Sequence, residues 1–142
     1  MSTTDDSQTR ATVGDELSRA LTARLRDALS SPAARRIATR APYLAARAVI
    51  CVGDEPTWGE FTRGDLALKT DAPLLYPWDF AIRGSVAGWS ALWQPVPAPG
   101  WHDLFALSKR GEMRFEGNLH PFLAHLQLFK DLLALPRGEP GR

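Results

Sequence analysis

The stretch Gly111–Asn118 (GEMRFEGN), together with the apolar-striped segment 119–135 that follows it, decides the fold. Alternation between the two glycines predicts a strand with Met113 and Phe115 on one face and charged side chains on the other. The closing asparagine is a suitable N-cap for a helix over 119–135, and Pro121 falls in the first turn of that helix. A strand with one apolar face therefore runs into a helix with a wide apolar stripe. Together they must enclose either a core or a ligand.

The other elements follow from apolar periodicity and turn residues. One central strand is predicted at 43–52, because this segment is apolar on both faces apart from Arg47. On another strand, 79–83, Phe80 and Ile82 face the same way. Two further strands are predicted at 57–63 and 66–69, and helices at 12–30, 33–40, 85–93 and 101–109. Five strands with helices at both ends predict an α+β domain whose helices cover one face of the sheet.

Composition predicts one domain over residues 12–136, between a disordered polar tail at 1–11 and a short tail at 137–142. The N-terminus has no apolar region of the secretory type, and no apolar run is long enough to span a bilayer, so a cytoplasmic location is expected. Cys51 is the single cysteine, which excludes an internal disulfide, and its apolar neighbours favour a buried thiol.

Charge is unevenly distributed along the chain. The net charge is +1, but residues 10–47 hold eight arginines against Asp15, Glu16 and Asp27. This region can make a weak contact with an anionic membrane surface or an acidic partner, although a solvated helix face is the commoner explanation. Nucleic acid is not expected as a partner, because the arginines are not interleaved with aromatic residues.

The segment 78–135 resembles the sterol carrier protein family, the small lipid-binding domain also called nonspecific lipid-transfer protein type two. The resemblance rests on strand Asp79–Gly84, the tryptophan-bearing helix Val86–Trp93, helix Asp103–Lys109, and the glycine-bracketed strand Gly111–Asn118 that feeds an amphipathic helix. The first half of the chain agrees in the order of its elements. The resemblance implies a five-stranded, largely antiparallel sheet with helices on one face. It also implies an apolar tunnel between them that takes fatty acyl chains, sterols or other lipids, as in lipid transfer. The proline-rich segment 94–100 departs from the family pattern near the expected tunnel mouth.

The expected ligand is therefore a hydrophobic small molecule or lipid, bound without catalysis. Arg83 or Arg114 near the opening can pair with a headgroup. The predicted ligand-binding residues are apolar positions on the inner faces of their elements, although sequence does not separate cavity lining from close-packed core: Phe80, Ile82, Trp89, Trp93, Phe105, Met113, Phe115, Phe122, Leu123 and Leu126.

Two other functions remain open. Bacterial members of the family occur fused to enzymes, so an accessory domain serving a partner enzyme such as a hydrolase is the main alternative. A small isomerase-type enzyme would need a polar pair facing the pocket, and the sequence offers no obvious one. Ser85 lacks the flanking glycines of a nucleophile elbow and is expected to cap a helix. His120 and His125 are five residues apart, which is unsuited to a shared metal on a helix. Catalytic residues, metals and cofactors are therefore not expected.

Overall fold

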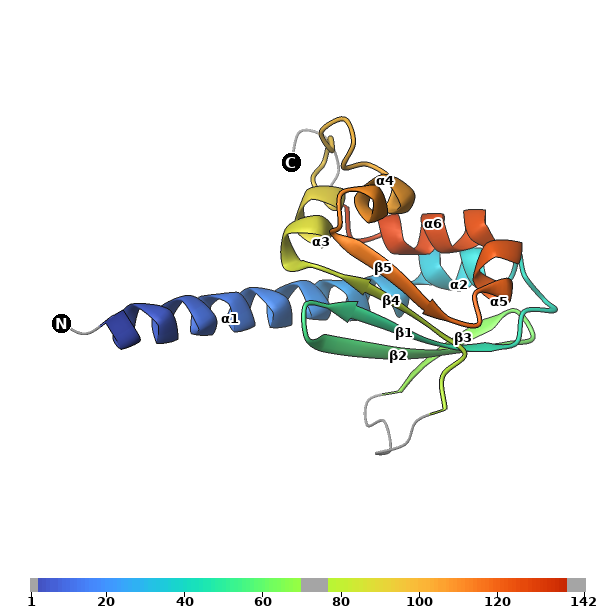
Figure 1. The fold of residues 1–142 in the computed structure, drawn as a ribbon. Helices are drawn as coiled ribbons and strands as arrows, with labels where there is room; N and C mark the ends of the chain where they lie inside the picture. The colour runs from blue at the N-terminus through green and yellow to red at the C-terminus, as the bar shows by residue number, and fades with distance from the viewer. Residues whose placement is uncertain (1–2, 70–76, 138–142) are drawn as a thin grey trace.

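The computed structural model describes residues 3–69 and 77–137, which form a sheet and a set of helices (Figure 1). The strands are β1 (Ala46–Val52), β2 (Glu55–Thr62), β3 (Asp65–Lys69), β4 (Phe80–Gly84) and β5 (Met113–Gly117). The helices are α1 (Thr3–Leu29), α2 (Pro32–Ala38), α3 (Val86–Leu92), α4 (Leu104–Lys109), α5 (His120–Ala124) and α6 (Leu126–Ala134). Every predicted strand is confirmed, with boundaries shifted by up to three residues.

The sheet has the order β3-β2-β1-β4-β5, so β1 lies at its centre as its two apolar faces predict. Neighbouring strands are antiparallel except for the parallel pair β1 and β4. A two-residue turn joins β2 to β3, in which Arg63 and Gly64 both have positive φ. That backbone geometry matches the twist of a hairpin. The largely antiparallel α+β fold is therefore confirmed.

The helices lie on one face of the sheet. Alternate residues of β1, including Ile50 and Val52, join Phe80 and Ile82 of β4 in the core beneath the helices. On the opposite face Val49, Cys51 and Ala81 form a small second cluster, against which Trp58 packs. Cys51 is a buried free thiol, as predicted. The core between sheet and helices is thus the place where an apolar ligand would have to enter.

Helix α1 begins at Thr3, nine residues before its predicted start, so the helix occupies most of the segment predicted to be a disordered tail. Its N-terminal part extends beyond the sheet (Figure 1). Val13 is exposed, whereas Leu21 and Leu25 are buried in the core. Packing of the second half of α1 against the core offsets the unfavourable free energy of helix nucleation. Each further turn that extends an existing helix then requires little additional free energy. Although α1 is long, none of the described helices is apolar enough along its length to cross a membrane.

The single helix predicted over 119–135 is wrong, because the chain forms α5 and α6 with a break at His125. The backbone N–H of His125 donates to Phe122 O at 3.3 Å, whereas its ring Nδ1 lies 3.2 Å from Pro121 O. The imidazole thus takes the carbonyl that the backbone amide of an unbroken helix would use. The predicted cap at Asn118 is wrong, because α5 begins at His120 and its N-cap residue is Leu119, which makes no capping hydrogen bond with its side chain. Asn118 Oδ1 instead accepts from His120 N at 3.2 Å in a local turn that precedes the helix.

The helix predicted from residue 101 also starts later than expected. Helix α4 begins at Leu104, and Asp103 caps it by accepting a hydrogen bond from Phe105 N at 3.1 Å. An aspartate with extended backbone is a favoured N-cap, which explains the later start. The division into a domain at 12–136 and two tails stays a prediction.

Candidate functional site

A small apolar hollow lies between the inner face of β1–β3 and the helices α1 and α6. Its volume is about 10 Å³. Leu29 of α1 and residues of α6 lie on the helical side, and three strands form the other side. The lining residues are Leu29, Ala48, Ile50, Thr57, Gly59, Phe61, Leu66, Leu68, Phe129, Leu132 and Leu133. None of these side chains carries a charge, so the hollow is built to accept apolar atoms.

Strand geometry explains which residues reach the hollow. Successive side chains of a strand point to opposite faces, so Thr57, Gly59 and Phe61 of β2 share the inner face. Leu66 packs closely over Gly59, because a Cβ added to this glycine would lie 3.2 Å from Leu66 Cδ1. Leu66 belongs to β3, which is the edge strand next to β2. The absence of a side chain at Gly59 therefore lets Leu66 approach β2 at the edge of the hollow.

Thr57 is the one lining residue with a polar side chain. It is 2% exposed, and its Oγ1 has no hydrogen-bond partner among the described residues. Buried hydroxyl groups are normally paired, since an unpaired one loses its hydration without compensation. The hollow therefore combines apolar walls with one unsatisfied hydroxyl group.

The predicted ligand-binding phenylalanines come together, but they pack against each other. The ring of Phe122 lies 5.7 Å from that of Phe80 and 5.1 Å from that of Phe115. Phe105 lies 5.5 Å from Phe115. Phe129 joins this group to the hollow, because its ring lies 5.5 Å from that of Phe122 and also lines the hollow. These contacts form an aromatic cluster beside the hollow.

Trp89 and Trp93 share a helix face as predicted, with ring centroids 5.0 Å apart. The indole N–H of Trp89 donates to Cys51 O at 2.8 Å, and that of Trp93 donates to Leu133 O at 2.7 Å. Trp89 also needs Gly84 beneath it, since a Cβ there would lie 2.3 Å from Trp89 Nε1. Both rings are fully buried and hydrogen-bonded, as stable core anchors are.

The remaining predicted residues differ in their burial. Ile82 and Met113 are buried in the core, Leu126 is half-buried, and Leu123 on α5 is 53% exposed. None of the ten predicted residues is among those that line the hollow. An open tunnel is not confirmed, and the predicted lining stays a prediction.

Residues of the hollow from the first half of the chain were missed by sequence reasoning. Thr57 and Gly59 were assigned to a strand without a role, although glycine inside a strand often marks close approach of another group. Gly59 lies two residues from both Thr57 and Phe61 and so shares their face of the strand. A glycine at such a position is the sequence signal that could have indicated the hollow. The expected function was placed near β4 and β5 because the family resemblance covers that half better.

Arg83 and Arg114 lie away from the hollow, on the outer face of the sheet. Arg83 donates to Glu116 at 2.8 Å and lies 3.5 Å from Cys51 Sγ, and Arg114 is 3.7 Å from Glu116. The hydrogen bond from Arg83 lowers the pKa of Glu116, and burial raises the pKa of the Cys51 thiol. The expected headgroup contact of these arginines stays a prediction, and in this structure both are paired with Glu116 instead.

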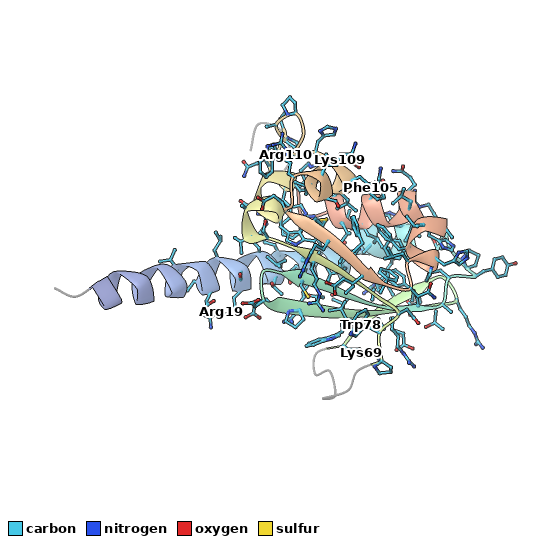
Figure 2. The ribbon with its side chains drawn as sticks, in the orientation of Figure 1. Arg19, Lys69, Trp78, Phe105, Lys109 and Arg110 are labelled. Atoms are coloured by element: carbon cyan, nitrogen blue, oxygen red, sulfur yellow. The ribbon has the colours of Figure 1, made fainter. Side chains whose placement is uncertain are left out.

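A polar cleft of about 190 Å³ separates the α4 end from α6. Its charged groups are paired with each other or with neighbours, since Lys130 lies 2.9 Å from Asp103 and Arg40 lies 2.6 Å from Asp131. Figure 2 shows Phe105 of α4 on the helical side of the sheet. The charged pairs make the cleft less suitable than the hollow for an apolar ligand.

Ser85 caps α3 as predicted, accepting from Gly88 N at 2.9 Å and donating to Glu112. Its hydroxyl is thus occupied by structural hydrogen bonds.

Within the part of the chain that the structure describes, no group of three or more histidine, cysteine or acidic side chains is arranged to hold a metal ion. Figure 2 also shows Lys69 and Trp78 on the side of the sheet away from α4.

Comparison with known proteins gives structural similarity at low sequence identity. No family model and no curated protein matches the chain. A structure described as a UbiJ-SCP2 ubiquinone synthesis protein is 17% identical, with a TM-score of 0.48, over 92% of this chain and 96% of that one. The apo form of sterol carrier protein 2 from Yarrowia lipolytica is 15% identical, with a TM-score of 0.46, over 82% and 88%. A conserved hypothetical protein of Thermus thermophilus, whose description includes the words sterol carrier protein, is 12% identical, with a TM-score of 0.46, over 76% and 81%.

Proposed function

We propose that this protein binds a hydrophobic small molecule, such as a lipid, between its sheet and its helices, and does so without catalysis. The observation that carries the proposal is the hollow beside β1–β3, whose lining has no charged side chain. Apolar burial is the driving force, at roughly 25 cal/mol for each Å² removed from water. No charged group has to be desolvated for a ligand to enter.

Binding requires the hollow to expand. Its volume is about 10 Å³, whereas pockets for small molecules measure roughly 300–1,000 Å³. The closed form is therefore the ligand-free member of a two-state equilibrium, and the ligand selects the open form. Closure of an empty apolar site is physically expected, because collapse restores the dispersion contacts that a void would lose.

The predicted ligand-binding residues are a proposed extension of the opened site. Phe129 lines the hollow and contacts the rings of Phe80 and Phe122. Displacing these rings would connect the hollow to the aromatic cluster and give a long chain a continuous apolar path. Support for this step comes from the ring contacts, which place the aromatic cluster directly beside the hollow.

Uptake of diphenylhexatriene, an uncharged probe that fluoresces in apolar surroundings, tests the proposal. The wild-type protein is expected to bind it, and Gly59→Val is expected to bind at least tenfold more weakly because the new side chain fills the hollow. Ala67→Val is the matched control, since Ala67 is exposed on the neighbouring strand β3 and pairs with Glu60 on the outer face. Far-ultraviolet circular dichroism checks that each variant is folded. Absence of probe uptake by the wild type would refute the proposal.

Docking of the arginine-rich region on an anionic membrane surface is proposed as an accompanying contact. Arg35 and Arg36 are exposed on α2, and α2 packs against β3 and α6 beside the hollow. Each arginine near an anionic surface contributes about 1 kcal/mol at ordinary salt. Cosedimentation with phosphatidylserine vesicles should fall when both are changed to glutamine, and Arg114→Gln on the outer sheet face serves as the control.

A further inference from the structure

We propose that the hollow selects an uncharged ligand with a single hydrogen-bonding oxygen, and that Thr57 is the residue that binds this oxygen. The inference rests on the proposed function and assigns a ligand class to its site. The hydroxyl of Thr57 is buried, lines the hollow and has no partner among the described residues. A neutral alcohol or carbonyl oxygen would satisfy it.

The apolar lining of the hollow determines which ligand charge it can accommodate. The other ten lining residues are apolar, so a carboxylate or phosphate in the hollow would be desolvated without a cation to pair with it. The arginines that could pair with such a headgroup, Arg83 and Arg114, lie on the opposite face of the sheet. An anionic lipid could enter only with its headgroup left outside, where it would gain nothing from Thr57.

A single water molecule fits the hollow less well than such a ligand. Buried waters make two to four hydrogen bonds, and the lining offers one polar side chain. A ligand that brings a long apolar body and one oxygen instead matches both features, because its body contacts the apolar walls while its oxygen pairs with Thr57. The unpaired hydroxyl of Thr57 in the ligand-free protein is thus the group that would bind the ligand oxygen.

The test compares dodecane, dodecanol and dodecanoate, which have the same chain length, as competitors that displace diphenylhexatriene. Dodecanol is expected to bind the wild type more tightly than either of the others. Thr57→Val should weaken dodecanol binding by about threefold to tenfold, the value of one net hydrogen bond, and leave dodecane binding unchanged. Thr57→Ser keeps the hydroxyl and should retain the preference. Thr62→Val, at an exposed position of the same strand, is the control.

The outcomes separate this inference from the proposed function. If diphenylhexatriene binds but dodecanol affinity does not depend on Thr57, the selection by this residue is refuted while the apolar site stands. Tighter binding of dodecanoate than of dodecanol would overturn the preference for an uncharged ligand. If the wild type takes up no probe, the proposed function fails and the ligand class fails with it.

Discussion

The substitution Thr57→Val should make the ligand-free protein more stable. Thr57 lies in β2, opposite Ile50 of the central strand, and its side chain is 2% exposed. Its Oγ1 has no partner among the described residues, whereas most buried polar groups in proteins are hydrogen-bonded. Valine has nearly the same shape and replaces that hydroxyl with a methyl group. The change therefore removes an unfavourable group without opening a cavity.

The size of the effect follows from two contributions. Burial of an unpaired hydroxyl costs about 1–3 kcal/mol, and this cost disappears in the valine variant. The added methyl group contributes up to about 0.8 kcal/mol more if it packs as well as an ordinary buried carbon. Valine also suits a strand at least as well as threonine does. We expect the free energy of unfolding to rise by about 1–3 kcal/mol.

Urea unfolding followed by tryptophan fluorescence measures this change. The midpoint should rise with the slope m unchanged, because the folded and unfolded surfaces are nearly the same. Thr57→Ser keeps the hydroxyl but loses a buried methyl group, and should be less stable than wild type by about 1 kcal/mol. Thr62→Val, which is exposed, should stay within about 0.5 kcal/mol. A Thr57→Val variant no more stable than wild type would show that the hydroxyl is already satisfied in solution.

Three further predictions concern the packing and the charges around the site. Gly84→Ala should destabilise the fold by about 2–4 kcal/mol in urea unfolding, because the new Cβ would lie 2.3 Å from Trp89 Nε1 and displace a hydrogen-bonded ring. Phe129→Ala should cost about 3–5 kcal/mol and increase diphenylhexatriene uptake per folded molecule, since it enlarges the hollow. The hydrogen bond from Arg83 lowers the pKa of Glu116 from 4.5, so its stabilisation is present above that value and lost as pH falls through the lowered pKa. Glu116→Gln should remove this loss from unfolding curves measured below pH 4.5, and an unchanged acid response would contradict the assignment.

Sequence patterns predicted the fold well where local chemistry and packing agree. The alternation of Met113 and Phe115, the two apolar faces of β1 and the cap at Ser85 each indicate a structure that burial then stabilises. The break at His125 was not predictable from apolar spacing, because the apolar stripe continues through it. A side-chain nitrogen competes there with the backbone for one carbonyl, and periodicity contains no information on that competition.

The candidate site was harder to predict than the fold for a physical reason. Phe122 and Phe129 belong to the same apolar stripe, yet only Phe129 lines the hollow. The difference depends on what faces each ring across the core, namely other rings for Phe122 and, for Phe129, the residues of β1–β3 that line the hollow as well. A void is a property of a set of side chains from several elements. Sequence alone gives the members of each face but not the space left between faces.

The packing on the α6 side and on the β3 side of the hollow indicates where it opens to admit a ligand. A dodecyl chain gains roughly 10 kcal/mol from burial, and most of this is offset by the cost of association, estimated at about 4–15 kcal/mol. Opening must therefore cost only a few kcal/mol, or binding would be undetectable. Phe129 of α6 is held by ring contacts to Phe61, Phe80 and Phe122, so moving α6 would break the centre of the core. On the other side β3 is an edge strand whose inward leucines are half-buried, and it is paired with β2 alone. Separation at the β3 side breaks fewer buried contacts, so ligand entry is expected there, one strand away from Thr57.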